Sequence, residues 1–257
     1  MIKGAIIVEL NKIYNQNCTQ FIKQIEDNSI DLIIADPPYN KGVANWDKFS
    51  MDEYNKFITN FIIEAKRILS NKGNLFIYNQ QPMAGLIFPN LYNNLYYVDE
   101  IIWYYKNGGG NSKNKCKNSH QLLYWFSKSK EYINNFDLVR QPYSGTRSKY
   151  KKNIDKNPKK VWVPNENGAK LTNVWEISIV RQTESTILSK IGIQKPLKIC
   201  DNIIKLGSNN NSIIYIPFAG SGSEIESCIR NNRKWIATEI NKDYIENVIK
   251  PRILNIR

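Results

Sequence analysis

Apolar and polar residues alternate along the first half of the chain in a way that predicts strands followed by helices. The run at 31–35 is short, apolar and followed by breakers, as a buried parallel strand is. Ser50 and Glu53 then have the spacing of a capping box, and apolar residues recur at helical spacing from Phe57 to Leu69. We expect a helix here that is stopped by Asn71-Lys72-Gly73.

The same pattern continues to the C-terminus, interrupted only in the middle of the chain. The further elements that we expect are a short helix capped by Thr19, a strand at 75–78, a helix at 83–95, strands at 101–105, 122–126 and 174–177, a helix from Pro196 to Gly207, a strand at 213–216, a helix at 223–230 and a strand at 235–239. Strands that alternate with helices imply an α/β fold with a doubly wound, mostly parallel sheet.

The middle of the chain has a different character. Residues 106–118 are rich in Gly, Asn and Lys, and residues 136–172 have no convincing periodicity. At 257 residues the chain can bury one large core. We therefore expect one α/β domain, made of residues 1–130 and 174–257, with residues 131–173 as an insertion.

The charge balance favours a polyanionic partner. The chain has 36 basic against 23 acidic residues, a formal charge of +13. Between residues 140 and 160 eight bases face a single acid, Asp155, and Tyr143, Tyr150 and Trp162 are interleaved with this basic segment. A solvated or disordered loop is the plain alternative, but aromatic residues among bases favour contact with phosphates.

Cysteine usage and hydropathy exclude several classes of protein. Cys18, Cys116, Cys200 and Cys228 are scattered without paired spacing, which argues against a zinc site and a disulfide framework. No apolar stretch approaches the roughly 20 residues that span a bilayer, and no signal peptide is visible. We expect a cytoplasmic protein with no metal and no membrane contact.

The first candidate site is the quartet Asp36-Pro37-Pro38-Tyr39, directly after the strand at 31–35. The carboxyl end of such a strand faces the crevice where α/β sheets bind ligands. The prolines fix φ and remove two backbone donors, which leaves carbonyl groups free to accept. Pro-Pro alone would indicate only a turn, whereas a carboxylate and a carbonyl beside an aromatic ring suit an amino group on a flat heterocycle.

The second candidate site is the turn Pro217-Phe218-Ala219-Gly220-Ser221-Gly222 after the strand at 213–216. Glycines at a strand-to-helix turn permit close approach of the backbone to a ligand. The next strand ends at Glu239, and an acid in this place usually accepts hydrogen bonds from ribose hydroxyls, although a solvated strand end would look the same. No Gly-Lys-Ser/Thr follows the glycines, which argues against hydrolysis of nucleoside triphosphates.

The quartet and the glycine turn, in this order, resemble the beta group of S-adenosylmethionine-dependent DNA amino-methyltransferases, which includes small adenine-N6 enzymes of restriction–modification systems. The resemblance covers nearly the whole chain. It implies a Rossmann-like methyltransferase sheet with a circularly permuted motif order. It also implies that residues 1–130 are catalytic, that residues 131–173 recognise the target sequence, and that residues 174–257 bind the cofactor.

The resemblance assigns roles to individual residues of this chain. The expected catalytic residues are Asp36, Pro37, Pro38 and Tyr39. The expected contacts to S-adenosylmethionine are Asn17, Cys18, Asp36, Lys195, Pro217, Phe218, Ala219, Gly220, Ser221, Gly222, Glu239 and Ile240. The expected contacts to nucleic acid are Lys106, Lys113, Lys115, Lys117, Arg140, Arg147, Lys149, Lys151 and Lys152.

The implied reaction is methylation of the N6 amino group of adenine in duplex DNA, with the base flipped out of the helix. Tyr39 is expected to stack on that base. N4-cytosine relatives more often carry Ser in place of Asp36, which favours adenine. An N4-cytosine enzyme, an enzyme that acts on RNA and a non-catalytic DNA-binding subunit of the same fold stay open as alternatives. A homodimer and a cognate restriction endonuclease are further expected partners.

Two departures from the family pattern stand at the second site. Ile216 occupies a position where members usually carry Asp, and Ser223-Glu224 replaces the usual Thr-Thr after the last glycine. The missing acid could hold the ammonium group of methionine. Its loss predicts weaker or differently arranged cofactor binding, or a member with reduced catalysis.

Overall fold

The computed structural model describes residues 8–42, 47–107, 113–144, 152–153, 161–180 and 194–256. Its main strands are β1 Lys12–Tyr14, β2 Ile30–Ala35, β3 Leu69–Asn79, β4 Tyr96–Tyr104, β5 His120–Ser127, β8 Val174–Glu176, β9 Ile213–Ile216 and β10 Lys234–Thr238. They form one sheet in the order β1-β10-β9-β2-β3-β5-β4-β8. All neighbouring pairs are parallel except the two pairs that involve β5, so the sheet is mostly parallel, as predicted.

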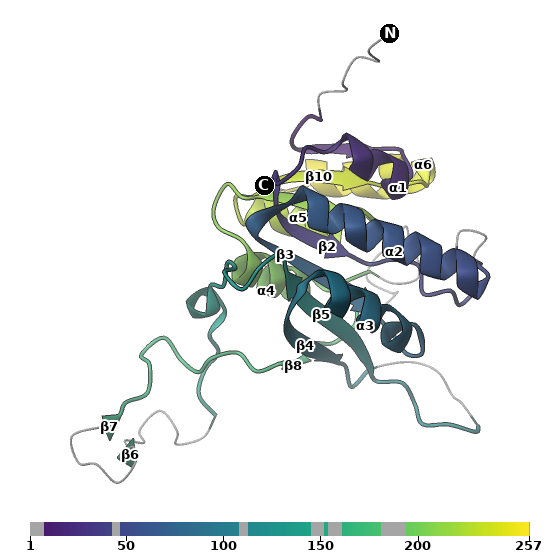
Figure 1. Ribbon diagram of the computed structural model, residues 1–257. Coiled ribbons are helices and arrows are strands. Elements are labelled where there is room, and N and C mark those ends of the chain that lie inside the picture. The colour runs from purple at the N-terminus through teal and green to yellow at the C-terminus, as the bar shows by residue number, and fades with distance from the viewer. Residues whose placement is uncertain are drawn as a thin grey trace.

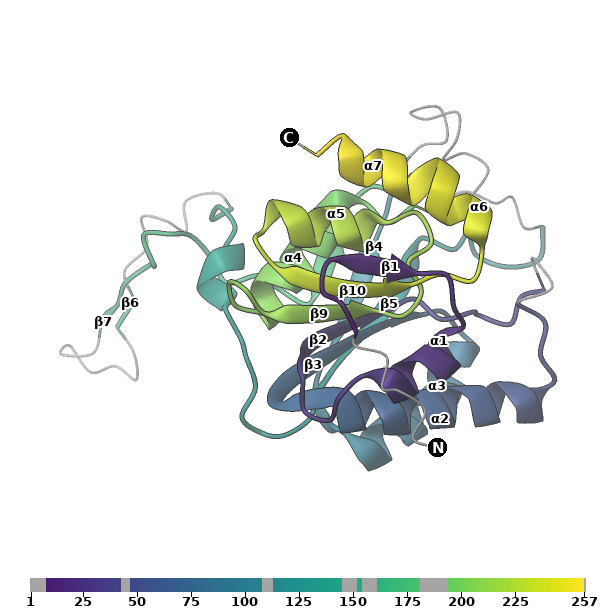
Figure 2. The same cartoon turned by 90° about the horizontal axis from the view of Figure 1, so that it is seen from above.

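Helices cover both faces of this sheet (Figures 1 and 2). One face is covered by α1 Cys18–Phe21, α2 Met51–Ile68 and α3 Met83–Asn94, and the other by α4 Leu197–Gly207, α5 Ser223–Arg230 and the C-terminal series α6 Lys242–Tyr244, η8 Ile245–Ile249 and α7 Lys250–Leu254. Each interface is a separate apolar core, with Phe61 and Ile77 in the first and Ile34 and Ile203 in the second. The structure confirms the doubly wound α/β fold.

Three local predictions need correction. The short helix is capped by Asn17 rather than Thr19, because the Asn17 Oδ1 accepts the Thr19 backbone N–H at 2.9 Å. The chain passes from α2 into β3 at Leu69 without an intervening stop. Gly73 lies inside β3, where a Cβ atom would be 2.9 Å from the Ile30 carbonyl oxygen. The absence of a side chain here therefore lets β3 pass close to β2. The last predicted strand ends at Thr238, one residue before Glu239.

Buried polar side chains hold loops to the core. Asn74 of β3 is completely buried, and its amide donates to the carbonyls of Ile133 and Gly207 at 2.9 and 3.0 Å while its oxygen accepts from the Trp125 indole at 2.8 Å. Every polar atom of this amide is therefore engaged. The contact fixes the end of α4 and the segment after β5 at the amino edge of the sheet.

Residues 131–173, the predicted insertion, start at this amino edge. The described part contains η3 Phe136–Val139 and the two-stranded pair of β6 Lys152–Asn153 and β7 Val161–Trp162. The Asn135 N–H donates to the Leu206 carbonyl at 2.9 Å. In both views the β6–β7 pair lies away from the main sheet (Figures 1 and 2). The division of the chain at residues 130 and 173 stays a prediction.

Among the described residues, no helix has both the length and the apolar character needed to cross a membrane.

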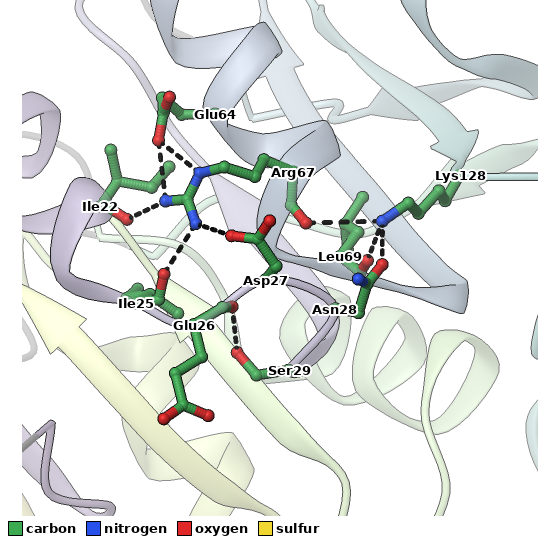
Figure 3. Close-up of polar contacts among 10 residues, drawn as sticks. All are labelled: Ile22, Ile25, Glu26, Asp27, Asn28, Ser29, Glu64, Arg67, Leu69 and Lys128. Carbon is green, nitrogen blue, oxygen red and sulfur yellow. Dashed lines mark hydrogen bonds and ion pairs between the residues drawn. The ribbon is translucent and has the colours of Figure 1, made fainter.

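Arg67, at the end of α2, holds the segment that leads into β2 (Figure 3). Its guanidinium donates to the carbonyls of Ile22 and Ile25 at 2.8 and 2.9 Å, and it pairs with Glu64 and Asp27 at 2.8 and 2.5 Å. Because Ile22, Ile25 and Asp27 all lie between α1 and β2, this one side chain ties that segment to the end of α2.

We expect Arg67→Met to lower the free energy of unfolding by about 2 kcal/mol, because two partly buried carbonyls lose their donor. Chemical denaturation measures this directly. Lys12→Met is the control: it removes a solvent-exposed ion pair to Glu9 and should change stability little. Equal effects of the two substitutions would contradict the role assigned to Arg67.

Candidate active site

The parallel pairing of β2 with β9 brings the two predicted sites together. Leu32 pairs with Ile214 and Ile33 with Tyr215, so both strands reach their carboxyl ends side by side. The Ile213 N–H also donates to the Asp31 carboxylate at 3.0 Å across 182 positions of sequence. The quartet after β2 and the glycine turn after β9 therefore share one edge of the sheet, where ligands of α/β folds bind.

Both oxygens of the Asp36 carboxylate have a partner. The Lys195 Nζ lies 2.7 Å from Oδ2, and the Tyr39 hydroxyl donates to Oδ1. The Lys195 side chain is 4% exposed, whereas that of Asp36 is 29% exposed. The Lys195 ammonium also lies 4.6 Å from the centre of the Tyr78 ring. A buried cation thus orients a carboxylate that is itself open to a ligand.

Among the other quartet residues, Pro37 has a free carbonyl acceptor and Tyr39 has a hydroxyl donor. The Tyr54 hydroxyl donates to the Pro38 carbonyl at 3.2 Å, while the Pro37 carbonyl accepts no hydrogen bond within the described part of the chain. Burial, reinforced by the Asp36 charge, raises the pKa of Tyr39, so its hydroxyl stays protonated and donates. The predicted stacking of Tyr39 on a base stays a prediction.

Positive charge gathers beside the quartet. Lys41 is exposed, its ammonium lies 5.3 Å from the centre of the Tyr39 ring, and its backbone N–H donates to the Asp47 carboxylate at 2.9 Å. Partial desolvation of its side chain lowers the pKa of Lys41, the charges of Asp47 and Asp36 oppose this effect, and the charges of Lys195 and Lys115 add to it. Lys115 therefore lies within electrostatic range of Lys41. No sequence motif marks Lys41 as a site residue.

Glu239 braces the glycine turn. Gly220 and Gly222 have φ angles of 50° and 76°, which side chains rarely adopt. The Glu239 carboxylate accepts the N–H groups of Gly220 and Asn241, each at 2.9 Å, and burial raises its pKa. Since each carboxylate oxygen can accept twice, Glu239 can hold the turn and still accept from a ligand.

The C-terminal helix is part of this site, which the sequence analysis missed. The Arg252 guanidinium donates to the Ser221 carbonyl at 2.7 Å and to the Ser223 hydroxyl at 2.9 Å, and it pairs with Glu226 at 3.1 Å. The Arg252 and Glu226 side chains are each 10% exposed. The turn is therefore fixed from the side of α7 as well as from Glu239.

The other predicted cofactor residues have varied surroundings. Cys18 opens α1, and burial raises the pKa of its thiol to about 12, which leaves it protonated. The Phe218 ring packs on Phe61 of α2, with ring centres 5.7 Å apart, and so anchors the turn in the core. The Pro217 carbonyl accepts the Thr238 hydroxyl at 2.7 Å, and Ala219 is buried, whereas Ile240 is half exposed.

The two departures from the family pattern have distinct surroundings. Ile216 is 1% exposed and belongs to the apolar core under α4 and α5. Glu224, the second residue of α5, is 5% exposed, and burial raises its pKa to about 7, against the opposing effect of the Lys195 charge. Sequence reasoning noted Glu224 only as a departure, because its burial beside Lys195 depends on the packing of α5.

The predicted nucleic-acid residues fall into two regions. Lys113, Lys115 and Lys117 are exposed in the connection from β4 to β5, which lies at the edge of the quartet because β4 runs parallel to β3. Lys106 pairs with Glu176 at 2.5 Å, while Arg140 pairs with Asp137 at 2.6 Å and donates to the Gly168 carbonyl. Lys152 stands in β6, and Arg147, Lys149 and Lys151 lie outside the described residues.

No group of three or more His, Cys, Asp or Glu residues within the described ranges is arranged to hold a metal ion.

Comparisons with known proteins agree with this geometry. The sequence profile described as DNA methylase, for N6 and N4 methyltransferases, matches residues 30–250. The type II methyltransferase M1.MboII of Moraxella bovis is 32% identical over 248 residues, which are 93% of this chain and 95% of that protein. The DNA adenine methyltransferase YhdJ of Escherichia coli strain K12 is 30% identical over 237 residues, 88% of this chain and 76% of the relative.

Solved structures share the fold. The PvuII cytosine-N4-specific DNA methyltransferase superposes with a TM-score of 0.65 at 14% identity, and the alignment covers 97% of this chain and 92% of that one. The complex of M1.HpyAVI with S-adenosylmethionine gives a TM-score of 0.65 at 22% identity, with 94% and 98% of the two chains covered. The chain belongs to the DNA methylase family of S-adenosylmethionine-dependent N6/N4 amino-methyltransferases.

Proposed function

We propose that the protein methylates the N6 amino group of adenine at a specific sequence in duplex DNA. The observation that carries this proposal is the pairing of β2 with β9, which joins the Asp36 quartet to the glycine turn. One half of the site offers acceptors for an amino group, and the other half offers a ribose acceptor. The two reactants would meet at the shared edge of the sheet.

The residues around the glycine turn fit S-adenosylmethionine. Glu239 keeps lone pairs for a ribose while it braces Gly220. The Tyr78 hydroxyl is fully buried and has no hydrogen-bond partner within the described ranges, so a polar ligand group would satisfy it. Among the predicted contacts, Asn17, Cys18, Ser221 and Gly222 would form the walls of this site. When bound, the cofactor supplies a methyl group activated by a positively charged sulfur.

Asp36 and Pro37 would activate the target nitrogen. An exocyclic amino group is a poor nucleophile because its lone pair is delocalised into the ring. Hydrogen bonds from this group to the Asp36 carboxylate and to the free Pro37 carbonyl would localise the lone pair on nitrogen. The buried Lys195 holds the carboxylate in place. Asp36 would stay hydrogen-bonded to the target nitrogen until that nitrogen, after methyl transfer, loses one of its protons.

Adenine is favoured over cytosine by the acid at the start of the quartet. Asp36 stands where N4-cytosine relatives more often carry Ser. The relative YhdJ, 30% identical to this chain, is named as an adenine methyltransferase. The N4-cytosine reaction is the second candidate, because the fold is shared with an N4-specific enzyme.

DNA would approach the edge of the sheet that carries the quartet. Lys41 follows the quartet, and the exposed Lys113, Lys115 and Lys117 stand in the connection from β4 to β5 at the same edge of the sheet. Contacts of these ammonium groups to phosphates would offset the few kcal/mol needed to flip a base. Residues 131–173 would recognise the target sequence. A restriction endonuclease of the same specificity and a second copy of the chain complete the proposed partners.

The proposed function is tested by transfer of labelled methyl groups from S-adenosylmethionine to duplex DNA, followed by analysis of the nucleosides. We expect N6-methyladenine as the labelled product. N4-methylcytosine would favour the second candidate, and labelling of RNA alone would contradict DNA as the substrate.

Asp36→Asn should lower the rate of methyl transfer by about 100-fold or more, because the charge that polarises the amino group is lost. Affinity for S-adenosylhomocysteine, measured on the same preparation, should change far less, which separates a catalytic defect from misfolding. A variant with wild-type transfer rates would refute the role of Asp36.

Substitution of Lys113, Lys115 and Lys117 by Gln should reduce the steepness with which DNA affinity falls with salt. Loss of three phosphate contacts lowers the slope of log affinity against log salt by about 2 to 3. The control replaces Lys66, Lys72 and Lys130, which are exposed toward the amino edge of the sheet, and should leave the slope unchanged. A reduced slope for the control variant, with an unchanged slope for the first variant, would place the DNA-binding face at the amino edge of the sheet.

A further inference from the structure

Two polar groups on the sheet face under α4 and α5 lack the partners that their burial demands. The Tyr78 hydroxyl has no hydrogen-bond partner among the described residues. Glu224 is 5% exposed, and within the described ranges its carboxylate accepts a hydrogen bond only from its own backbone N–H and makes no ion-pair contact. A buried acid with a single local donor and no paired cation is costly, so this pair of groups indicates a ligand.

The neighbouring cations are already committed to other acids. Lys195 makes its ion pair with Asp36 at 2.7 Å, and Arg252 makes its ion pair with Glu226 at 3.1 Å. Both cations lie within electrostatic range of Glu224, since each lowers the pKa that burial has raised. Glu224 is therefore a third buried acid beside two cations that are each bound elsewhere.

The position of Glu224 relates it to the glycine turn. It stands two residues after Gly222, while Glu239 contacts the opposite part of the turn through Gly220. Asp36 and Lys195, which pair with each other at 2.7 Å, both act electrostatically on Glu224, so its carboxylate lies within electrostatic range of the quartet. If the ribose of a ligand is bound at Glu239 and its reactive methyl group lies near Asp36, its amino-acid end still needs a binding partner, and Glu224 is near it.

We propose that Glu224 binds the ammonium group of the amino-acid part of S-adenosylmethionine. The inference rests on the proposed placement of the cofactor between Glu239 and Asp36. An ammonium group offers three donors and a full positive charge, which a buried carboxylate with one local donor and no paired cation lacks. Family members usually carry a negative charge at the position of Ile216, at the end of β9. Here Glu224, in the first turn of α5, would supply that charge instead.

This assignment accounts for the departures at Ile216 and Glu224 together. Ile216 extends the apolar core to the end of β9, where an acid would have been expected from the family pattern. In the absence of ligand Glu224 is partly protonated near neutral pH, because its pKa is about 7. An ammonium group beside it would favour the ionised form, so binding completes an ion pair that the protein alone does not make.

The test compares, by isothermal titration calorimetry, two ligands in which the sulfur atom is an uncharged thioether. S-adenosylhomocysteine carries the ammonium group, and 5′-methylthioadenosine has the same adenosine without the amino-acid part. Glu224→Gln, which keeps the shape of the side chain, should weaken S-adenosylhomocysteine by about tenfold or more. Affinity for 5′-methylthioadenosine should stay within about twofold. An equal loss for both ligands, or no loss for either, would overturn the proposal.

Two further variants serve as controls. Glu226→Gln changes an acid on the same helix that is similarly buried but already paired with Arg252. Because Arg252 holds the glycine turn, this variant should lower the affinity for both ligands alike. Glu239→Ala should also weaken both ligands. If Glu239→Ala does so while Glu224→Gln leaves S-adenosylhomocysteine unchanged, only the role of Glu224 is wrong. If neither variant affects either ligand, the proposed placement of the cofactor fails as well.

Discussion

The parallel contact between β2 and β9 is the constraint on which the rest of the site depends. It is a short pairing, made by Leu32 with Ile214 and Ile33 with Tyr215 and reinforced by the Asp31 carboxylate. Because parallel strands end at the same edge, it brings together two loops from opposite ends of the chain. The helices on both faces, the brace at Glu239 and the clamp at Arg252 all stabilise the geometry that this contact creates.

Buried charge is the second organising feature. Lys195 reaches Asp36 from the segment before α4, and Arg252 reaches Glu226 from α7, so elements far apart in sequence are joined by ion pairs whose cations are largely buried. Removing one partner of such a pair leaves an uncompensated charge and typically costs about 3–5 kcal/mol. The same pairs hold the acids of the site in fixed positions. The arrangement thus both connects elements that are distant in sequence and preorganises the environment for a cationic ligand.

Local signals predicted much of this structure. The capping box at Ser50 and Glu53 starts α2, and α5 spans the predicted residues 223–230, since both helices are specified by neighbours in sequence. The quartet and the glycine turn were found because each is a short contiguous motif. The roles of Arg252, Lys41 and Glu224 were missed because they depend on contacts between distant segments. Gly73 was misinterpreted for the same reason: its function is set by the Ile30 carbonyl on the neighbouring strand.

The central claim is that the methyl donor lies between the glycine turn and the quartet. A crystal structure of the protein with S-adenosylhomocysteine bound tests it most directly. We expect the ribose hydroxyls to contact Glu239, the sulfur atom to face Asp36 and the ammonium group to contact Glu224. A nucleoside bound at another edge of the sheet, or in the reverse orientation with its ribose at Asp36, would contradict the account.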